Sequence, residues 1–402
     1  MAPRLNLLRV VELLLVLCTL PNCHCSSSSS SAVINNDDFQ GATTSTVAAV
    51  EEWKRIEEEE FEIGYVQSLR VNTPAVATVK STYQTIEIYN SSHFGKVFVL
   101  DNCLQLTERD APHYNEMLAH VPVMEYLAQH GDSASDALRV LVLGGGDGYV
   151  VSELLKHPQI QHIDHVELDE EVINVSKQYL PWSDAWKDDR VNLVIGDGAA
   201  FVKEQVEKGQ SYHVIVQDAS DPFWLEDDGS VTIAPSSVLY EPAHFERLYK
   251  LLHPGEGGGG GGGDGGGGGV LMIQAETYNI PSNLESIRKW RAQLQNLGFE
   301  KVRYGSISIS TYPMGQIGFF SAHVFDGAGS GECRSNAACD DETTANDIVL
   351  DGMDTKSWST VLAQFNKMRG KTLYYHPRIH RSSFDLPLWV EEEIYGSGVV
   401  GE

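Results

Sequence analysis

Residues 138–148 of the 402-residue chain read LRVLVLGGGDG, an apolar run followed by a glycine-rich turn. The run Arg139–Leu143 is typical of a strand that is buried on both faces. The glycine-rich turn after it lets a ligand approach the backbone and meet the amino end of a helix. The turn lacks the last glycine of the dinucleotide fingerprint G-x-G-x-x-G, because Tyr149 or Val151 occupies that position. The stretch therefore predicts the first strand and turn of an α/β sheet, without a standard dinucleotide site.

Strand-like and helix-like segments alternate downstream of this turn. The predicted strands are His162–Leu168, Val191–Ile195 and His213–Gln217, and the predicted helices are Val150–His157 and Glu170–Tyr179. Alternating strands and helices form a parallel, doubly wound sheet. Ligands of such sheets bind beyond the carboxyl ends of the strands, so the residues that follow each strand form the candidate site.

An acidic residue follows each of the first four strands of this sheet. These residues are Asp147, Glu167, Asp197 and Asp218, and Asp221 lies one turn beyond the last of them. A single aspartate at a strand end is more often a helix N-cap than a ligand, but caps poorly explain four acidic residues on one edge. Glu167 lies 21 residues after Gly146, where an acidic side chain suits ribose hydroxyls. We therefore expect a positively charged nucleoside, such as an S-adenosyl sulfonium compound.

The formal net charge of −27 restricts the partners of the chain. Phosphate binding needs clustered Lys and Arg, so the charge argues against a DNA or RNA partner. An acidic surface attracts cations, small polyamines included, although many soluble proteins are acidic for solubility alone. No Cys/His spacing resembles a zinc site, and we expect no metal.

The first 25 residues are predicted to be a signal or targeting segment. Arg4 and Arg9 supply a positive start, Val10–Leu20 an apolar stretch, and Cys23–Ser26 a cleavage region. The apolar stretch of eleven residues is too short to span a bilayer. The segment favours the secretory pathway or an organelle, and a leader without function would leave the chain in the cytoplasm.

The rest of the chain divides by composition. Residues 26–60 end in the acidic run Glu57–Glu60, which is typical of a polar linker and a solvated helix end, and not of a site. Residues 61–136 predict an N-terminal antiparallel β domain with a connecting helix, Pro112–His130. Residues 137–395 form the α/β domain, with a glycine-rich insertion at 256–269 and a polar insertion at 326–355. We expect Gly257–Gly269 to bury no side chains.

Several motifs occur in order along the chain. They are Tyr83-Gln84, Phe94–Val97, Leu104–Asp110, Tyr114–Met117, Gly144–Gly148, Glu167–Asp169, Gly196–Gly198, Asp218–Pro222, Gln274–Glu276 and Thr311–Gly318. In this order they resemble the spermidine/spermine synthase family, from about Glu62 to Trp389. The strings Asp-x-Ser-Asp-Pro and Thr-Tyr-Pro-x-Gly-Gln-Ile-Gly are the ones most typical of that family.

The resemblance implies roles for individual residues. The residues that would hold decarboxylated S-adenosylmethionine are Gln84, Asn115, Asp147, Glu167, Asp197 and Gly198. Asp218 would be the catalytic acid/base, and the residues around the amine acceptor would be Gln105, Tyr114, Asp221 and Tyr312. The chain departs from the family pattern in three places. Asn115 replaces the usual Gln or His, a tryptophan before the first hairpins is absent, and Phe223–Ser237 is longer than the usual gate loop.

The resemblance also implies a fold, an activity and an assembly. The fold would be a Rossmann-like domain of the class I methyltransferase type, preceded by a small β domain, in a homodimer. The activity would be transfer of the aminopropyl group of decarboxylated S-adenosylmethionine to putrescine, giving spermidine and methylthioadenosine. The donor is a co-substrate, so no cofactor is expected. A carboxylate beside the attacking amine fits this reaction, because free alkylamines have a pKa near that of lysine, about 10.4, and must lose a proton.

Three alternatives remain at this point. Spermine or thermospermine synthesis is the nearest one, because acceptor length depends on pocket walls that a sequence does not show. An S-adenosylmethionine-dependent methyltransferase would share the sheet, but its donor carries a carboxylate that Asp147 would repel. A polyamine-binding protein without catalysis is the third, and the intact Asp218, Asp221 and Tyr312 argue against it.

Overall fold

The computed structural model describes residues 52–60, 62–131, 137–225, 231–253, 268–325, 353, 355–368 and 370–396. The predicted targeting segment, most of the glycine-rich insertion and nearly all of the polar insertion, with Cys333 and Cys339, lie outside these residues. None of the helices in the described ranges is long and apolar enough to cross a membrane.

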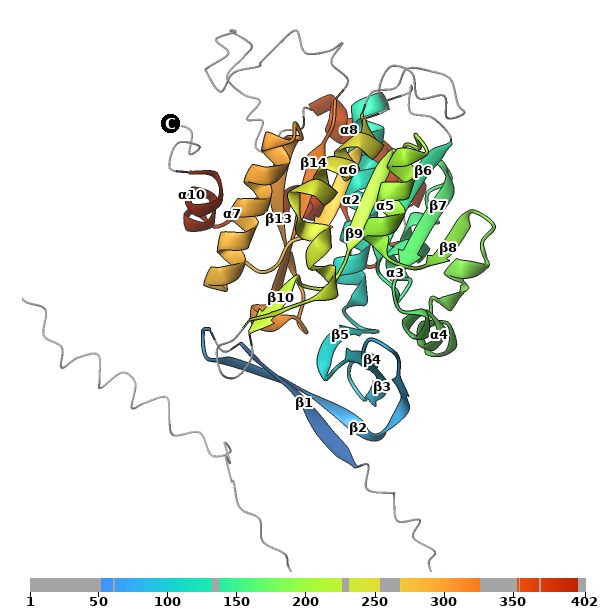
Figure 1. The fold of residues 1–402 in the computed structure, drawn as a ribbon, viewed down its shortest axis with the longest axis vertical. Coiled ribbons are helices and arrows are strands. Elements are labelled where there is room, and N and C mark those ends of the chain that lie inside the picture. Colours follow the sequence, from blue (N-terminus) through green and yellow to red (C-terminus); the bar gives the residue numbers. More distant parts are fainter. Residues whose placement is uncertain are drawn as a thin grey trace, which may run out of the picture. The chain divides into compact units, whose positions relative to one another are not determined.

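A five-stranded antiparallel sheet forms the N-terminal part of the described chain (Figure 1). Its strands, in spatial and chain order, are β1 (Trp53–Glu60), β2 (Tyr65–Lys80), β3 (Thr85–Ser91), β4 (Gly95–Leu100) and β5 (Cys103–Thr107). Ile86, Ile88 and Phe98 on one face pack against Val172 and Val175 of the following α/β domain. The sheet is therefore held against the edge of that domain on which the candidate site lies.

The first strand of this sheet corrects the prediction of a polar linker over residues 26–60. Trp53–Glu60 is a strand that pairs with β2 along its whole length, from Trp53 opposite Asn72 to Glu60 opposite Tyr65. Its side chains alternate, with Ile56 buried, while Glu57 and Glu59 are exposed. The acidic run hides the period of two, because both faces of the strand carry glutamates. Pairing with β2, rather than local propensity, makes this segment a strand.

The α/β domain is built on a seven-stranded sheet in the order β13-β14-β12-β9-β6-β7-β8. These strands are β6 (Leu138–Gly144), β7 (Ile160–Glu167), β8 (Val191–Ile195), β9 (Val214–Asp218), β12 (Val270–Gln274), β13 (Glu300–Ser308) and β14 (Gln316–His323). The five strands from β12 to β8 run parallel, whereas β14 is antiparallel to both of its neighbours. The expected Rossmann-like sheet is thus confirmed, with an antiparallel pair added at one edge.

Helices cover both faces of this sheet. The longer ones are α2 (Ala111–His130), α4 (Glu170–Tyr179), α5 (Gly198–Glu207), α6 (Pro242–Leu252), α7 (Pro281–Asn296) and α8 (Thr355–Met368). The shorter ones are α3 (Tyr149–Leu154), α9 (Pro377–Ser382) and α10 (Leu388–Tyr395). Val140 and Val142 of β6 pack in the core with α2 and α8, while Leu141 and Leu143 pack in the core with α6 and α7. Burial on both faces explains the continuous apolar run of this strand.

The last two glycines of the glycine-rich insertion correct the expectation that the insertion runs to Gly269 as a loop. Gly268 and Gly269 are buried, and the Gly269 amide donates to the Leu252 carbonyl at 3.0 Å while its carbonyl accepts from the Val324 amide at 2.9 Å. A Cβ at Gly269 would lie 2.6 Å from the His213 carbonyl oxygen. These two residues therefore pack directly before β12, and only 257–267 remain a candidate for harmless deletion.

We expect Gly269→Ala to lower the free energy of unfolding by about 1–3 kcal/mol, because its methyl group would overlap backbone atoms of the neighbouring strand. Deletion of 257–267 should change that free energy by only about 0.5 kcal/mol, since closing a shorter loop between paired ends costs little. Urea unfolding of both variants measures the difference. A deletion as damaging as Gly269→Ala would show that the removed glycines contribute to packing.

Candidate active site

The glycine-rich turn and the end of β9 lie against each other. Gly144 is paired with Asp218 in the parallel register, and the Gly145 amide donates to the Asp218 carbonyl at 2.9 Å. Gly145 has a φ of +65°, and a Cβ there would lie 2.9 Å from Oδ2 of Asp218. A residue without a side chain is needed here, because any other would push on the Asp218 carboxyl group.

The carboxyl group of Asp218 is positioned by a tyrosine from another element. The hydroxyl of Tyr114, on α2, donates to Oδ1 of Asp218 at 2.7 Å. Burial raises the pKa of Asp218 to about 6, although the bond from Tyr114 opposes the shift. Burial and the adjacent carboxylate also raise the pKa of Tyr114, which keeps its hydroxyl a donor. Asp218 is thus a carboxyl group that gains or loses a proton close to neutral pH.

Two further carboxyl groups lie on the same edge, at the ends of β6 and β7. Burial, and then the neighbouring Asp218, raise the pKa of Asp147 to about 8, while its Oδ1 accepts from the Tyr149 amide at 2.8 Å. Burial raises the pKa of Glu167 to about 7, with smaller contributions from Asp169 and Asp218. The ends of these strands therefore bring Asp147, Glu167 and Asp218 together, as the sequence predicted.

Gln84 joins the β domain to this edge. Its side-chain amide donates to Oδ2 of Asp169 at 3.0 Å, and the Ser81 hydroxyl donates to the same oxygen at 2.6 Å. The other oxygen of Asp169 accepts from the Glu171 amide at the start of α4. Asp169, which was not among the predicted site residues, therefore holds Gln84 beside Glu167. The sequence did contain a signal for Asp169, because this residue lies only two positions after Glu167 at the end of the same strand.

Asp197 is a helix cap, which is the alternative that the sequence left open for each acidic residue. It is exposed, and its Oδ1 accepts from the amides of Ala199 and Ala200 at 2.7 and 3.1 Å, in the first turn of α5. Satisfying these amides is the ordinary role of an aspartate at this position. Gly198 is the first residue of the same helix. A donor contact by either residue stays a prediction.

Asn115 is buried in α2, next to Tyr114. Its side-chain amide donates to the Ala111 carbonyl at 2.9 Å, and its Oδ1 has no hydrogen-bond donor among the described residues. An unsatisfied buried acceptor is costly in a native protein and is often completed by a ligand or water. Oδ1 of Asn115 is therefore available for the predicted contact with the donor.

A second group of polar side chains surrounds Asp221. Oδ1 of Asp221 accepts from the side-chain amide of Gln274 at 3.2 Å, and the Tyr240 hydroxyl donates to the other end of that amide at 3.1 Å. The Tyr312 hydroxyl donates to Oε2 of Glu276 at 2.8 Å. Tyr312 and Asp221 thus lie in one cluster with Gln274, Tyr240 and Glu276, to which the sequence assigned no role in the site.

Glu276 is the most unusual member of this cluster. It is 3% exposed, its φ is +44°, and its Oε1 has no hydrogen-bond donor among the described residues. Burial, and then the charge of Asp221, raise its pKa well above the ordinary value. A strained backbone and a buried, unsatisfied carboxyl group are features of functional sites. Glu276 lies just beyond the carboxyl end of β12, and Asp218 is at the carboxyl end of β9. Both are therefore on the edge of the sheet where ligands bind.

Glutamates of β1 lie close to the same cluster, which corrects the view of the acidic run as a solvated end. Burial, and then the charge of Asp221, raise the pKa of Glu60. Glu58 accepts from the side chain of Gln67 and from the Leu104 amide, and burial raises its pKa. These carboxyl groups extend the acidic site from the α/β domain onto the β domain.

Gln105 has the weakest structural support of the predicted acceptor residues. It is exposed on β5, and its side-chain amide donates to the Cys103 carbonyl of its own strand at 3.4 Å. Its role near the acceptor stays a prediction.

Comparison with known proteins assigns the family. Residues 111–325 match the spermine/spermidine synthase domain, and residues 64–108 match the spermidine synthase tetramerisation domain. The chain belongs to the spermine/spermidine synthase family. It is 32% identical to spermidine synthase 1 of Datura stramonium over 320 residues, which are 79% of this chain and 86% of that protein. The family resemblance that the motifs predicted is confirmed.

Solved structures of this family share the fold. One is a spermidine synthase crystallised with the transition-state analogue AdoDATO, and it matches with a TM-score of 0.63 at 23% identity. The match covers 85% of this chain and 95% of that one. The predicted combination of an antiparallel β domain and a Rossmann-like domain is thereby confirmed.

Relatives in this family differ in the group that their names say they transfer. Putrescine N-methyltransferase 2 of Nicotiana tabacum is 31% identical over 316 residues, which are 78% of this chain and 74% of that protein. Membership of the spermine/spermidine synthase family therefore leaves the transferred group to be argued from the residues of the site.

Proposed function

We propose that this protein transfers the aminopropyl group of decarboxylated S-adenosylmethionine to putrescine, giving spermidine and methylthioadenosine, with Asp218 as the catalytic residue. The observation that carries the proposal is that Asp218 lies among other buried carboxylic acids. After burial, the charge of Asp218 contributes to the raised pKa values of Asp147 and Glu167. The charges of Glu276, Asp221 and Asp218 likewise add to burial in raising the pKa of Tyr240. A site lined by several acids suits a reaction in which both substrates are cations.

The donor end supports a nucleoside without a carboxylate. Glu167 is placed to accept from ribose hydroxyls, as acidic residues at the end of the second strand do in related sheets. Asp147 follows the first strand, where the tail of the nucleoside would lie. An ammonium tail would pair with Asp147, while the carboxylate of ordinary S-adenosylmethionine would be repelled by it.

The reaction needs an acceptor amine that has lost its proton. The lone pair of that nitrogen attacks the CH₂ beside the sulfonium, the C–S bond breaks with its electrons going to sulfur, and neutral methylthioadenosine leaves. Asp218 would accept the proton of the acceptor ammonium and stabilise the positive charge that develops on nitrogen. Its pKa of about 6 leaves it mostly ionised at neutral pH, as a base must be.

An acceptor panel tests this proposal. The full chain is incubated with decarboxylated S-adenosylmethionine and with putrescine, cadaverine or spermidine in turn, and the products are identified by mass. The proposal predicts spermidine as the fastest-formed product. Absence of any aminopropylated product, with retained binding of putrescine, would favour a polyamine-binding protein.

Donor binding should release protons near neutral pH. In the free protein the pKa values of Asp147 and Glu167 are about 8 and 7, so both carboxyl groups are partly protonated at pH 7. A cationic donor favours their charged forms, and we expect release of on the order of one proton per site. Calorimetry in buffers of different ionisation enthalpy measures it. The apparent affinity should rise between pH 6 and pH 8 because deprotonation and binding are linked. A binding enthalpy independent of the buffer at pH 7 would contradict this.

A longer acceptor is the second candidate, and the glutamates of β1 favour it. Glu58 and Glu60 continue the acidic lining beyond Asp221, where a third amine of spermidine would lie. With spermidine as the acceptor, the product would be spermine or thermospermine.

We expect Glu60→Gln to raise the KM of spermidine by about tenfold and that of putrescine by less, since one ion pair of about 1.4 kcal/mol is lost only with the longer amine. Glu57→Gln is the matched control, because Glu57 is exposed on the same strand. Equal increases in the KM of spermidine and of putrescine would show that Glu60 does not select between the two acceptors.

The assembly is also a proposal. The match of residues 64–108 to a tetramerisation domain supports an oligomer, and the sequence resemblance implied a dimer. Light scattering at several protein concentrations distinguishes a dimer from a tetramer.

A further inference from the structure

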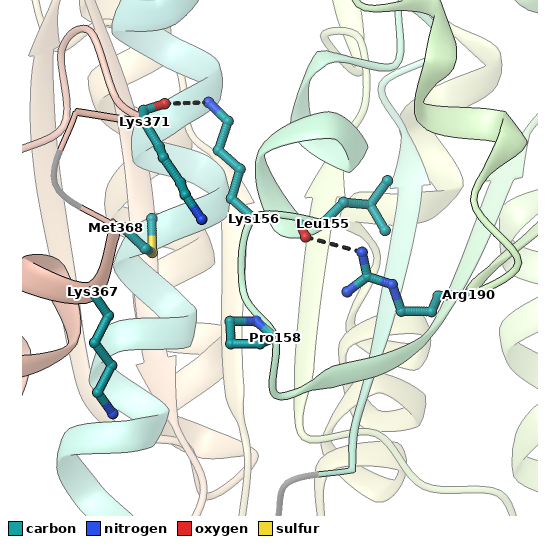
Figure 2. Close-up of a pocket in the computed structure, with 7 residues that line it drawn as sticks. All are labelled: Leu155, Lys156, Pro158, Arg190, Lys367, Met368 and Lys371. Carbon is teal, nitrogen blue, oxygen red and sulfur yellow. Dashed lines mark hydrogen bonds between the residues drawn. The ribbon is translucent and has the colours of Figure 1, made fainter.

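A cavity of about 320 Å³ lies at the edge of the α/β sheet opposite to the candidate active site. Leu155 and Pro158 belong to the turn that leads into the start of β7, and Arg190 directly precedes β8. The other wall comes from the end of α8 and the residues after it, with Lys367, Met368 and Lys371 (Figure 2). The predicted helix Val150–His157 ends at Leu154, which frees Leu155–Pro158 to form this turn.

The lining of this cavity is basic, in contrast to the rest of the chain. Four of its seven lining residues are Lys or Arg, whereas the whole chain has 29 basic and 56 acidic residues. Two of the four cations have partners. The Lys156 ammonium donates to Glu153 and to the Lys371 carbonyl, and the Arg190 guanidinium donates to Asp188 and to backbone carbonyls (Figure 2).

The other two cations, Lys367 and Lys371, are exposed at the mouth of the cavity. No hydrogen bond or ion pair within the described ranges involves the ammonium groups of Lys367 and Lys371. Both residues line the cavity. In Figure 2 the Lys371 side chain points towards the space between α8 and the Leu155–Pro158 turn, whereas the Lys367 side chain runs downward, away from Lys371. The charges of Lys156 and Lys371 reach the buried His157 behind this turn and contribute to lowering its pKa, which burial lowers most. Positive charge therefore converges on the cavity.

The backbone of Lys371 is held in place by hydrogen bonds. The Lys371 carbonyl accepts from Lys156 at 2.6 Å, and the Lys371 amide donates to the Met368 carbonyl at 2.9 Å. Lys367 in the last turn of α8 also suits the negative end of the helix dipole. Lys371 lies beyond the end of α8 and does not interact with its dipole in this way. The helix dipole therefore does not explain why four basic residues line the cavity.

We propose that this cavity binds the phosphate group of a small organic phosphate, with Lys367 and Lys371 as its direct partners. Ammonium groups form short, charge-assisted hydrogen bonds to phosphate oxygens. The apolar side chains of Leu155, Pro158 and Met368 provide a surface for the organic part. The volume lies at the lower limit of small-molecule sites, about 300 Å³, which restricts the ligand to one of few atoms.

Calorimetric titration of the full chain with three probes tests this. The probes are inorganic phosphate, pyrophosphate and ribose 5-phosphate, which lack an adenine that the donor site would hold. We expect ribose 5-phosphate to bind more tightly than inorganic phosphate, because only the former contacts the apolar wall. The double variant Lys367→Gln/Lys371→Gln should weaken binding at least about tenfold, and added KCl should weaken binding to the wild type.

Two matched variants keep the test specific. Lys208→Gln/Lys250→Gln removes the same charge from exposed lysines that pair with glutamates four residues earlier, and it should leave binding within about twofold of wild type. Lys367→Arg/Lys371→Arg keeps the charge and should retain binding. Absence of binding by all three probes at low millimolar concentration would overturn the proposal. Equal losses in the cavity variant and the Lys208/Lys250 variant would overturn it as well, since only the overall charge would then matter.

Discussion

Asp218→Asn should lower turnover by about 10²–10⁴-fold while the fold and donor binding are kept, because an amide cannot accept the proton of the acceptor ammonium. The asparagine side chain has the same shape and can still accept the hydrogen bond from Tyr114, so the end of β9 should stay in place. Rates in a single turnover, with the donor saturating, isolate the chemical step from product release.

Tyr114→Phe is the informative comparison for this variant. It removes the bond to Oδ1 of Asp218 but leaves the carboxylate. The loss of turnover in Tyr114→Phe should therefore be smaller than in Asp218→Asn. It should correspond to one hydrogen bond to a charged group, which is about 1.5–3 kcal/mol. Near-normal turnover of Asp218→Asn would remove Asp218 from the catalytic role. A larger loss in Tyr114→Phe than in Asp218→Asn would make the tyrosine the more important group.

Asp147→Asn should reduce the preference for the decarboxylated donor over S-adenosylmethionine. Within about 4 Å of Asp147, a carboxylate tail costs on the order of 1–4 kcal/mol, while an ammonium tail gains a comparable amount. The wild type should therefore prefer the decarboxylated donor by at least about tenfold, which is about 1.4 kcal/mol. The preference should increase from pH 6 to pH 9, because the pKa of Asp147 in the free protein is about 8 and only its charged form discriminates.

Calorimetric titration with both donors, on wild type and variant, measures this preference. Asp184→Asn is a control for net charge, since Asp184 is 82% exposed and lies outside the site. If the wild type binds both donors equally, or if Asp147→Asn leaves their ratio unchanged, Asp147 is not the discriminating residue. The methyltransferase alternative would then gain support, in keeping with the N-methyltransferase among the relatives.

Ligands of parallel sheets bind beyond the carboxyl ends of the strands, and these ends share one edge of the sheet. This rule predicted much of the site from the sequence. It located Asp147, Glu167 and Asp218, which lie close enough together that the charge of Asp218 adds to burial in raising the pKa of the other two. Asp197 also follows its strand, but its side chain caps its own helix, and its contact with the donor stays a prediction. Local pattern cannot tell these outcomes apart, since both place an aspartate between a strand and a helix.

Other parts of the site depend on contacts between distant segments. Tyr114 and Asp218 are 104 residues apart, and only the packing of α2 on the sheet brings them together. Glu60 was hidden in an acidic run whose strand period is visible only once β2 pairs with it. Glu276 lies two residues beyond its strand in a strained conformation, which no propensity would indicate.

A competition between the two donors distinguishes aminopropyl transfer from methyl transfer in a single reaction. The protein is given equal concentrations of decarboxylated and ordinary S-adenosylmethionine together with putrescine, and both nucleoside products are quantified with the amine products. The account predicts methylthioadenosine and spermidine in equal amounts, with little S-adenosylhomocysteine. S-adenosylhomocysteine formed in step with N-methylputrescine, and no methylthioadenosine, would contradict it.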